Sequence, residues 1–230
     1  LSLDFVYSTT RPGTRLAETH SDLLGQTTLC FSDKVNPEVE AVFLCLGHGH
    51  SKPFLEAHHF SDTTVIIDLS NEFRLQKEAN FQSESFVYGL PEYQRERIQQ
   101  ARCIANPGCF ATAIQLALLP LAHHQSINNS VHINAVTGST GAGVGLSPTT
   151  HFSWRNQNVS WYKPFTHQHL DEIEETLFSK QEARELLFLP QRGNFTRGIF
   201  ATAYTRYDGS LQEVQDLFEN YYENHPFTQV

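Results

Sequence analysis

The stretch RCIANPGCFATA, residues 102–113, contains a strand, a turn and the start of a helix. Residues 102–105 form a short apolar run that predicts a buried strand, and Asn106, Pro107 and Gly108 predict a turn. Cys109 follows the turn, and apolar residues recur with helical period from 110 to 123. A strand that passes directly into a helix is the repeating unit of an α/β fold with a parallel sheet.

The rest of the first half repeats this alternation. Residues 3–7, 40–46 and 63–68 are apolar runs ended by polar residues or glycine, which is typical of strands buried on both faces. We expect helices at residues 51–59 and 95–101. Together these elements predict a doubly wound, mostly parallel nucleotide-binding sheet.

The second half has a different pattern. Residues 131–136 and 198–207 alternate as strands, and the first of these leads into a glycine-rich loop. Residues 170–180 and 211–222 have the period of amphipathic helices. We therefore expect two domains, a nucleotide-binding domain over residues 1–108 and an α+β domain over residues 109–230.

Composition argues against several classes of function. The 230 residues include 16 Lys and Arg against 25 Asp and Glu, and this net charge of −9, without a basic cluster, disfavours nucleic-acid binding. The longest apolar runs, such as residues 117–122, are too short to span a bilayer. No Cys-x-x-Cys pair occurs, and Cys30 and Cys45 lie in apolar runs that predict buried, reduced thiols. We therefore expect a cytoplasmic protein.

Cys109 is the candidate nucleophile. At the first turn of a helix its sulfur would face unpaired backbone N–H groups and the positive end of the helix dipole, and both favour the thiolate. Pro107 and Gly108 let the backbone approach a ligand closely. Position alone does not separate such a nucleophile from a buried structural cysteine near a turn.

Two further motifs carry groups suited to chemistry. His167 and His169 directly precede a predicted helix, where either one suits a general acid/base for a thiolate, whereas a metal site lacks a third ligand of suitable spacing. Loop 138–143, Gly-Ser-Thr-Gly-Ala-Gly, offers backbone amides to an anion, although such loops are also common turns. His48 and His50 follow a predicted strand, either lining a pocket or forming a polar turn.

Residues 104–120, IANPGCFATAIQLALLP, match throughout the active-site signature of the N-acetyl-gamma-glutamyl-phosphate reductases, which are relatives of aspartate-semialdehyde dehydrogenase. The sequence resembles this family along essentially its whole length. Five other blocks agree in the same order: VIIDLSNEFRL (65–75), VYGLPE (87–92), GSTGAG (138–143), YKPFTHQHLDEIEETL (162–177) and GNFTRGIF (193–200). The family has a strand and a glycine-rich loop before the position of Leu1 and a helix after that of Val230, and we expect the sequence to lack both.

The resemblance implies a step of arginine biosynthesis. Cys109 would attack the gamma-acyl phosphate of an N-acylglutamyl substrate and expel phosphate, and a nicotinamide hydride would reduce the thioester to the semialdehyde. His167 would be the acid/base, with His169 as the alternative. Asn106, His169 and Arg197 would contact the substrate, although a structural ion pair is the alternative for Arg197. The second domain would be the catalytic and dimerisation domain of a homo-oligomer.

The cofactor is expected to be NADP. NAD-specific folds place an acidic residue after the second strand to bind the ribose 2′-hydroxyl, and residues 8–11 here are Ser-Thr-Thr-Arg if residues 3–7 form that strand. Hydroxyls and a guanidinium suit a 2′-phosphate instead. We expect cofactor contacts from Ser8, Thr9, Arg11, Gly47, His48, Ser70, Pro107, Gly141 and Gly143.

Three other functions fit parts of the sequence. The first is a related acyl-phosphate reductase, such as aspartate-semialdehyde dehydrogenase. The second is a papain-like hydrolase built on Cys109, which the strand–helix order and the lack of a papain-type cysteine motif disfavour. The third is a non-catalytic homologue that binds a ligand. The sequence does not distinguish an N-acetyl from an N-succinyl substrate.

Overall fold

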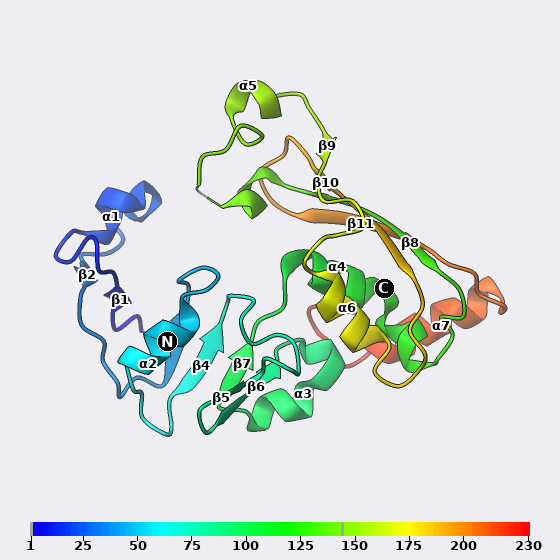
Figure 1. The fold of residues 1–230 in the computed structure, drawn as a ribbon, viewed down its shortest axis with the longest axis horizontal. Coiled ribbons are helices and arrows are strands. Elements are labelled where there is room, and N and C mark those ends of the chain that lie inside the picture. Colours follow the sequence, from blue (N-terminus) through cyan, green and yellow to red (C-terminus); the bar gives the residue numbers. More distant parts are fainter. Residues whose placement is uncertain (1, 144) are drawn as a thin grey trace.

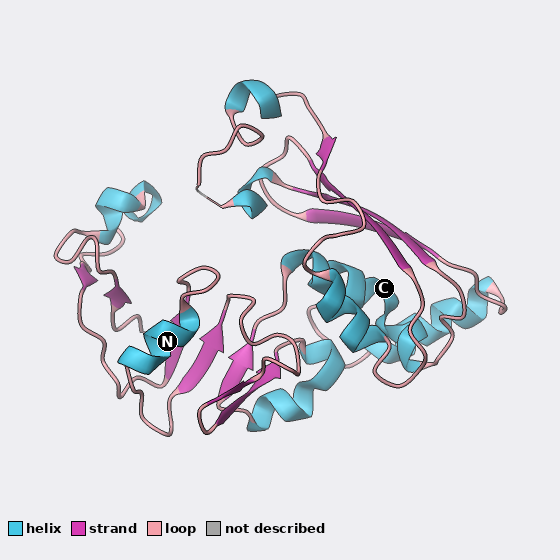
Figure 2. Cartoon of the chain, in the orientation of Figure 1, coloured by secondary structure: helices cyan, strands magenta, loops and turns pink. Residues whose placement is uncertain are grey.

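The computed structural model describes residues 2–143 and 145–230. Its N-terminal half is built on a five-stranded sheet and its C-terminal half on a four-stranded sheet, with a small lobe at the N-terminal end (Figure 1). Three helices of the C-terminal half (Cys109–His123, Leu170–Leu177 and Leu211–Tyr222) lie on one face of its sheet, and the short helix Phe152–Arg155 lies beyond one end of the sheet (Figure 2).

The five-stranded sheet has the order β3-β4-β7-β6-β5, in which the first four strands are parallel and β5 is an antiparallel edge strand. The strands are β3 (Ala41–Leu44), β4 (Val65–Asp68), β5 (Asn80–Phe81), β6 (Glu84–Tyr88) and β7 (Cys103–Ala105). Helix α2 (Ser51–Ala57) connects β3 to β4, and α3 (Pro91–Gln100) connects β6 to β7. The predicted mostly parallel sheet is confirmed.

Several elements of this half differ from the predictions, α3 and β6 among them. Helix α3 begins at Pro91 rather than at residue 95, because proline at the first helical position needs no N–H donor and has a helical φ. The sequence does not predict β6, because only Phe86 of its residues is fully buried. The Phe86 ring stacks on that of Phe73, with centroids 3.9 Å apart, in the core of this half.

The small lobe contains β1 (Val6–Tyr7), α1 (Leu16–Thr19), the 3-10 turn η1 (Ser21–Leu23) and β2 (Phe31–Ser32). β1 pairs in parallel with β2 alone, and the two form a separate sheet. The prediction that residues 3–7 form a strand of the main sheet was therefore wrong. The backbone of this segment is paired within the lobe, where the Ser8 N–H donates to the Ser32 carbonyl at 2.8 Å.

The four-stranded sheet has the order β11-β8-β10-β9, with β8 and β10 parallel and the other pairs antiparallel. The strands are β8 (Val131–Thr137), β9 (Ser160–Trp161), β10 (Leu186–Arg192) and β11 (Ile199–Tyr204). The helices are α4 (Cys109–His123), α5 (Phe152–Arg155), α6 (Leu170–Leu177) and α7 (Leu211–Tyr222), with a 3-10 turn η2 (Ser139–Ala142) after β8. This is the mixed α+β arrangement that the sequence predicts for the second half.

The sequence predicts neither the two-residue strand β9 nor β10, in which Pro190 argues against a central strand. The Pro190 carbonyl accepts a hydrogen bond from the Tyr162 N–H at 3.1 Å, so the proline nitrogen faces the same side. That side carries only the short strand β9, which pairs with β10 at Gln191 and Arg192. The lack of an N–H group at Pro190 therefore removes no hydrogen bond between β8 and β10.

Helix α4 ties the two halves together. It leaves the turn after β7, and its buried residues, including Phe110 and Ile114, pack in one core with Ile133 of β8 and Ile173 of α6. The helix therefore begins at the edge of the first sheet and belongs to the core of the second.

The cysteines differ from the prediction at two positions. Cys30 and Cys45 are exposed, because Cys30 lies in the small lobe and Cys45 follows β3, an edge strand with a single neighbour. Cys103 is buried in β7, and burial raises the pKa of its thiol to about 12. Among the described residues, no helix has both the length and the apolar character needed to cross a membrane.

Candidate active site

The start of α4 places Cys109 where the two halves meet. β7 ends at Ala105, and the Asn106 N–H donates to the Asp68 carbonyl at 2.8 Å, which fixes the turn against the neighbouring strand. Cys109 is the first residue of the helix, and its side chain is exposed. The predicted strand, turn and helix are confirmed, and the thiol is open to a ligand rather than buried in a core.

The imidazole of His169 lies directly over Gly108. A β-carbon at residue 108 would be 2.4 Å from His169 Nε2 and 2.6 Å from Glu172 Oε1, distances that real β-carbons do not show. His169 is buried, as is Glu172 one helical turn later. Glycine before Cys109 is therefore required by the close approach of these two side chains.

His167 is also buried and lies in an aromatic environment. Its ring centroid is 5.4 Å from that of Phe110 and 5.5 Å from that of Phe188, and it stands nearly perpendicular to the His169 ring at 4.7 Å. His167 Nδ1 accepts the backbone N–H of His169 at 3.2 Å. An accepting Nδ1 means that the neutral ring carries its proton on Nε2.

Both histidines are held neutral at pH 7. Burial lowers the pKa of His167 to about 4, with a further contribution from the charge of Lys163. Burial also lowers the pKa of His169 to about 3, and the nearby His167 and Arg74 add to this. The Glu172 carboxylate, 3.8 Å from His169 Nε2, favours the charged ring but does not outweigh burial. A neutral imidazole is the form that accepts a proton.

Glu172 of α6 is the centre of a buried polar network that joins the two halves. Its Oε1 accepts Arg74 Nη1 at 3.1 Å, and its Oε2 accepts the Tyr88 hydroxyl at 2.8 Å and the Gly108 N–H at 3.1 Å. Burial and the Glu172 charge raise the pKa of the Tyr88 hydroxyl, which therefore stays a donor. The carboxylate therefore joins α6 to Arg74, to β6 and to the turn before Cys109.

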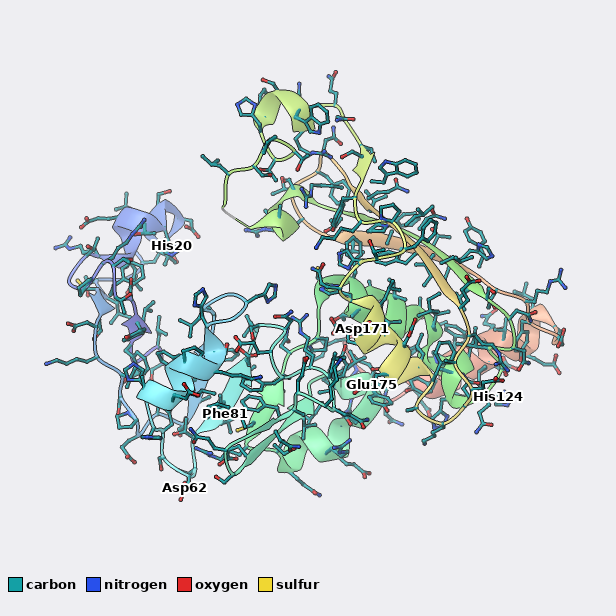
Figure 3. The ribbon with its side chains drawn as sticks, viewed as in Figure 1. His20, Asp62, Phe81, His124, Asp171 and Glu175 are labelled. Atoms are coloured by element: carbon teal, nitrogen blue, oxygen red, sulfur yellow. The ribbon has the colours of Figure 1, made fainter. Side chains whose placement is uncertain are left out.

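Each of the three guanidinium nitrogens of Arg74 donates a hydrogen bond in this network. Besides Glu172, it donates Nε to the Asn106 carbonyl at 2.9 Å and Nη2 to the Leu69 carbonyl at 3.3 Å. One turn further along α6, Glu175 accepts the Gln76 N–H at 2.9 Å, so the helix meets the first half along this face (Figure 3). The turn before Cys109 is therefore held from both halves of the molecule.

Sequence reasoning did not find Arg74, Tyr88 or Glu172 as site residues. All three lie in blocks that carry the family resemblance, but 98 residues separate Arg74 from Glu172 and no local spacing joins them. The only signal was an acidic residue on the buried face of an amphipathic helix.

The expected cofactor residues lie along the carboxyl ends of the parallel strands. Gly47 and His48 follow β3, where Gly47 has a φ of 83°, and both are exposed. Ser70 follows β4 but is buried, and its hydroxyl donates to Asp68 at 2.6 Å. Pro107 is buried in the turn before Cys109. This edge of a doubly wound sheet is where nucleotides bind.

The other expected cofactor residues of the first half lie in the small lobe. Ser8 follows β1, and Thr9 and Arg11 are exposed. Arg11 Nη1 donates to the Thr19 hydroxyl at 2.7 Å. Because that partner is an exposed hydroxyl, the guanidinium can exchange it for an anion at little cost.

The glycine-rich loop after β8 packs on the loop that precedes β11. The N–H groups of Ser139 and Thr140 donate to the carbonyls of Phe195 and Thr196, at 2.8 and 3.1 Å. The Gly141 N–H donates to Gly138, and the Gly143 N–H donates to Thr140. These amides are therefore not available to an anion, and any cofactor contact at Gly141 or Gly143 would use other atoms.

Two of the expected substrate residues, Asn106 and Arg197, are exposed. Asn106 is exposed in the turn before Cys109, and its amide nitrogen donates to the Pro107 carbonyl at 3.1 Å. Arg197 is exposed at the end of the β10–β11 connection and makes no side-chain hydrogen bond or ion pair within the described residues. Its guanidinium is therefore not used in a structural ion pair there.

Comparison with known proteins identifies the family. A model of the semialdehyde dehydrogenase NAD-binding domain matches residues 1–101, and a model of the semialdehyde dehydrogenase dimerisation domain matches residues 109–230. The N-acetyl-gamma-glutamyl-phosphate reductase of Flavobacterium johnsoniae is 57% identical over 232 residues, which cover 100% of this chain and 71% of that protein. The chain belongs to the semialdehyde dehydrogenase family. The same-named protein of Christiangramia forsetii is 52% identical, over 99% of this chain and 70% of its own length.

Solved semialdehyde dehydrogenases have the same fold. Aspartate semialdehyde dehydrogenase from Francisella tularensis superposes with a TM-score of 0.63 at 10% identity, covering 94% of this chain and 72% of that one. Aspartate semialdehyde dehydrogenase II from Vibrio cholerae gives 0.60 at 14% identity, covering 94% of this chain and 78% of that one. At these identities the likeness establishes the fold and not the substrate.

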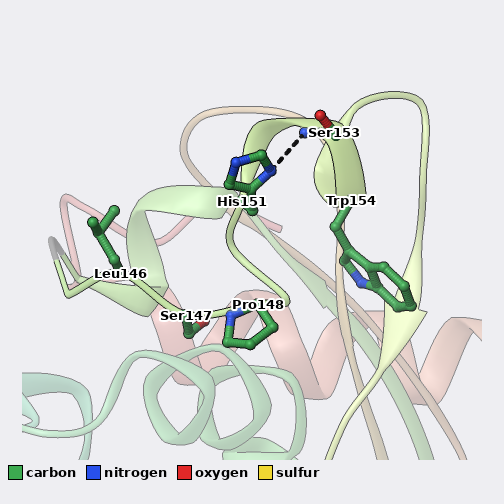
Figure 4. A pocket seen from close by; sticks show the side chains of 6 residues that line it. All are labelled: Leu146, Ser147, Pro148, His151, Ser153 and Trp154. Carbon is green, nitrogen blue, oxygen red and sulfur yellow. Dashed lines mark hydrogen bonds between the residues drawn. The ribbon is translucent and has the colours of Figure 1, made fainter.

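Two pockets of the chain do not include Cys109 in their lining. One, of about 560 Å³, is an open, mostly apolar hollow lined by Leu146, Ser147, Pro148, His151, Ser153 and Trp154 around α5 (Figure 4). The other, of about 290 Å³, is polar and borders Arg74, Tyr88 and Glu172. Because neither pocket contains Cys109, the candidate active site is identified by its reactive side chains and not by the size of a pocket. Within residues 2–143 and 145–230, no three His, Cys, Asp or Glu side chains are placed to hold a metal ion.

Proposed function

We propose that this chain catalyses the NADPH-dependent reduction of an N-acyl-gamma-glutamyl phosphate to the N-acylglutamate 5-semialdehyde, a step of arginine biosynthesis. The observation that carries the proposal is an exposed thiol, Cys109, at a helix start on the carboxyl edge of the nucleotide-binding sheet, beside the buried neutral His169. The names of the 57% and 52% identical relatives support the substrate.

The chemistry follows from this arrangement. Cys109 passes its proton to a histidine and attacks the acyl carbon, the bond from that carbon to the phosphate oxygen breaks, and a thioester remains. A bound nicotinamide cofactor supplies the hydride that reduces the thioester carbon. The carbon–sulfur bond then breaks, the aldehyde leaves, and Cys109 recovers its proton. Backbone N–H groups at the start of α4 suit the oxyanion that develops on the acyl oxygen.

The geometry favours His169 over His167 as the proton acceptor, although the sequence alone favoured His167. His169 contacts Gly108, the residue bonded to Cys109, whereas His167 packs in T-shaped contacts against Phe110 and Phe188. We assign His167 a supporting role, because its Nδ1 accepts the His169 N–H and fixes that backbone.

The cofactor assignment uses the residues of the small lobe and of the sheet edge. Residues 8–11 contain no acid that would repel a 2′-phosphate, and Arg11 offers a guanidinium for it. Gly47, His48 and the segment around Ser70 would face the rest of the cofactor along the strand ends, since a nucleotide spans this edge in doubly wound sheets. These residues fit NADP.

The substrate carries two anionic groups, and the exposed side chains of Arg197 and Asn106 suit its polar groups. The Arg197 guanidinium matches a carboxylate or a phosphate through two parallel hydrogen bonds. The Asn106 amide can donate to a carbonyl beside the thiol. We propose that these two side chains bind the substrate with His169.

The test is phosphate-dependent reduction of NADP with N-acetylglutamate semialdehyde, measured for the parent, Cys109→Ala and Cys30→Ala. The Cys30 thiol is exposed but lies in the small lobe, so its variant controls for loss of a thiol. We expect activity in the parent and in Cys30→Ala and none in Cys109→Ala. Inactivity of an intact parent, or activity of Cys109→Ala, would reject the proposal.

The same assay decides between related substrates. N-succinylglutamate semialdehyde and aspartate semialdehyde are run beside the N-acetyl compound at matched concentrations. Higher kcat/KM for one N-acyl group identifies the physiological acyl group. Higher kcat/KM for aspartate semialdehyde would replace the glutamyl assignment.

We propose further that the chain forms a homo-oligomer through the open face of the four-stranded sheet. On that face Phe200 of β11 pairs with Val136 of β8, and Tyr204 pairs with His132. Phe200, Tyr204 and Trp161 are 71%, 59% and 68% exposed, which leaves a large apolar surface. The match to a dimerisation domain supports a second copy of the chain as its partner.

The location proposed for the enzyme is the cytoplasm. All four cysteines, Cys30, Cys45, Cys103 and Cys109, are free thiols. A chain with free thiols, one of them a proposed nucleophile, is suited to a reducing compartment.

A further inference from the structure

The carboxyl end of β10 carries a guanidinium with unused hydrogen-bonding capacity. Arg192 is half-buried, and its Cζ lies 4.7 Å from the ring centroid of Tyr162. Its Nη1 donates to the Thr149 hydroxyl at 3.5 Å, and its Nε is buried with no partner among the described residues. A buried N–H group without an acceptor is destabilising. Arg192 is therefore suited to an anionic ligand that accepts from its guanidinium.

A second arginine, Arg155, lies beside Arg192 and adds positive charge. Arg155 is 6% exposed, and it donates Nη1 to the Arg192 carbonyl and Nη2 to the Ser160 hydroxyl, the latter at 2.7 Å. Burial lowers the pKa of its guanidinium, and the charge of Arg192 lowers it further. In the part of the chain that the structure describes, neither arginine has an Asp or Glu within ion-pair distance. Two like charges held close together favour the binding of an anion beside them.

The sequence around the two arginines contains no acidic residue. Residues 131–170 and 186–207, which include β8, β10 and β11, have no Asp or Glu, in a chain whose net charge is −9. The Lys and Arg residues of these two segments are Arg155, Lys163, Arg192, Arg197 and Arg206. Such a separation of charge attracts anionic ligands to this part of the molecule.

Tyr162 connects this end of β10 to the nucleophile. Its ring centroid lies 5.6 Å from that of His167 and 6.5 Å from that of Phe110, the residue after Cys109. Burial raises the pKa of the Tyr162 hydroxyl, the charge of Arg192 lowers it, and the charge of a Cys109 thiolate raises it. Arg192 and Cys109 therefore both lie near Tyr162.

We propose that Arg192 is a specificity-determining residue that binds a carboxylate at the far end of the substrate's N-acyl group, which makes the substrate an N-succinyl rather than an N-acetyl compound. This inference rests on the proposed function and names its acyl group. In an extended N-succinylglutamyl chain about eight bonds separate the reacting carbon from that carboxylate, a span of about 9 Å. The chain is long enough to reach from the thiol past one aromatic ring. An N-acetyl group ends in a methyl group and leaves the guanidinium without an anion.

The decisive variant is Arg192→Met, which keeps an apolar stem over Tyr162 and removes the charge. Phosphate-dependent reduction of NADP is measured with N-succinyl- and N-acetylglutamate semialdehyde. We expect the parent's kcat/KM to be about 10- to 100-fold higher for the N-succinyl compound, as one charge-assisted contact provides. Arg192→Met should lose this preference through the N-succinyl compound, with kcat/KM for the N-acetyl compound within about twofold of the parent.

Arg206→Met is the matched control, because it makes the same substitution at the opposite end of the same sheet. Arg192 pairs with Thr137, the last residue of β8, whereas the exposed Arg206 follows Tyr204, which pairs with His132 near the start of β8. This variant should keep the parent's preference. Arg192→Lys keeps the charge without the planar fork and should keep part of the preference.

Three results would overturn the inference. The first is a parent that prefers the N-acetyl compound. The second is an equal fall in kcat/KM for both compounds in Arg192→Met, which would place the guanidinium at the shared α-carboxylate or in support of the fold. The third is a rise in KM for phosphate with an unchanged acyl preference, which would place it at the phosphate.

A binding measurement separates this inference from the proposed function. N-succinylglutamate and N-acetylglutamate, which lack the aldehyde, are titrated into the parent and into Arg192→Met by isothermal titration calorimetry. N-succinylglutamate should bind the parent at least about 10-fold more tightly than N-acetylglutamate, and the two should bind Arg192→Met alike. A parent without reductase activity would reject the proposed function. Equal binding of the two ligands to the parent, or binding of neither, would overturn the acyl-carboxylate site.

Discussion

Replacing Gly108 by alanine tests how closely the histidine and the carboxylate approach the nucleophile's turn. Gly108 has φ −66° and ψ 149°, which alanine also adopts, so the substitution alone should stabilise by about 0.4–1 kcal/mol through the unfolded chain. The new methyl group, however, would lie 2.4 Å and 2.5 Å from His169 Nε2 and Cε1 and 2.6 Å from Glu172 Oε1. Overpacking of buried groups costs about 1–3 kcal/mol.

Movement of Glu172 adds a second cost. It weakens the 3.1 Å bond from the Gly108 N–H to the carboxylate, and hydrogen bonds to charged groups contribute about 1.5–3 kcal/mol. We therefore expect Gly108→Ala to lower the free energy of unfolding by about 2–5 kcal/mol, with kcat reduced because His169 is displaced.

Urea unfolding and steady-state kinetics check this prediction. Gly145→Ala is the matched control, because nothing lies within 4 Å of a β-carbon at that position and its φ is not in the left-handed region. That variant should stay within about 0.5 kcal/mol of the parent. If Gly108→Ala matches Gly145→Ala in stability and in kcat, the close approach of His169 to the turn is refuted.

Three other predictions concern pH, cofactor and assembly. The pKa values of His167 and His169, about 4 and about 3, lie below the ordinary value of 6.5. Between pH 6.5 and these lower values the unfolded chain binds more protons than the folded chain. The free energy of unfolding should therefore fall as the pH drops from 6.5 toward 4, by up to about 1.4 kcal/mol per pH unit for each ring. His167→Asn should make this fall about half as steep, and an unchanged slope in urea titrations would contradict it. Arg11→Ala should raise KM for NADPH about 10- to 100-fold, because one charge-assisted contact with the 2′-phosphate is lost. KM for NADH, which lacks that phosphate, should stay within about twofold. Equal changes for both cofactors would reject the 2′-phosphate contact. Phe200→Asp should give monomers in sedimentation velocity, whereas Leu24→Asp, at a 78% exposed position in the small lobe, should sediment like the parent; a parent that is already monomeric would refute the interface.

The fold was largely predictable because its main elements carry local signals. The apolar runs of β3 and β4 and the helical periods of α4 and α7 are visible in windows of a few residues. β10 was not predictable, because a proline argues against a central strand. Pro190 is tolerated because its nitrogen faces the side of β10 that carries only the short strand β9. The pairing of β1 with β2, outside the main sheet, likewise depends on which strands become neighbours.

The site was predictable only in part, for a related reason. Cys109 at a helix start and the two histidines before α6 have recognisable local chemistry. Glu172 resembles any acidic residue of an amphipathic helix, and Arg74 resembles any surface arginine. Their roles come from burial against each other across 98 residues of sequence. The choice between the histidines was equally non-local, since it depends on which ring contacts Gly108.

The polar contacts between the two halves argue that Cys109 keeps a fixed position relative to the nucleotide-binding sheet. Arg74 and Tyr88 bind Glu172 at the site. At the start of α3 the backbone carbonyl of Glu92 accepts the Tyr221 hydroxyl and its carboxylate accepts the Thr228 hydroxyl, each at 2.9 Å. Rotation about the turn before α4 would break these bonds together, and those to the buried carboxylate alone contribute about 1.5–3 kcal/mol each. The small lobe has no such contacts with the second half among the described residues. We therefore expect cofactor binding to move the lobe that carries Arg11 rather than the turn that carries the thiol.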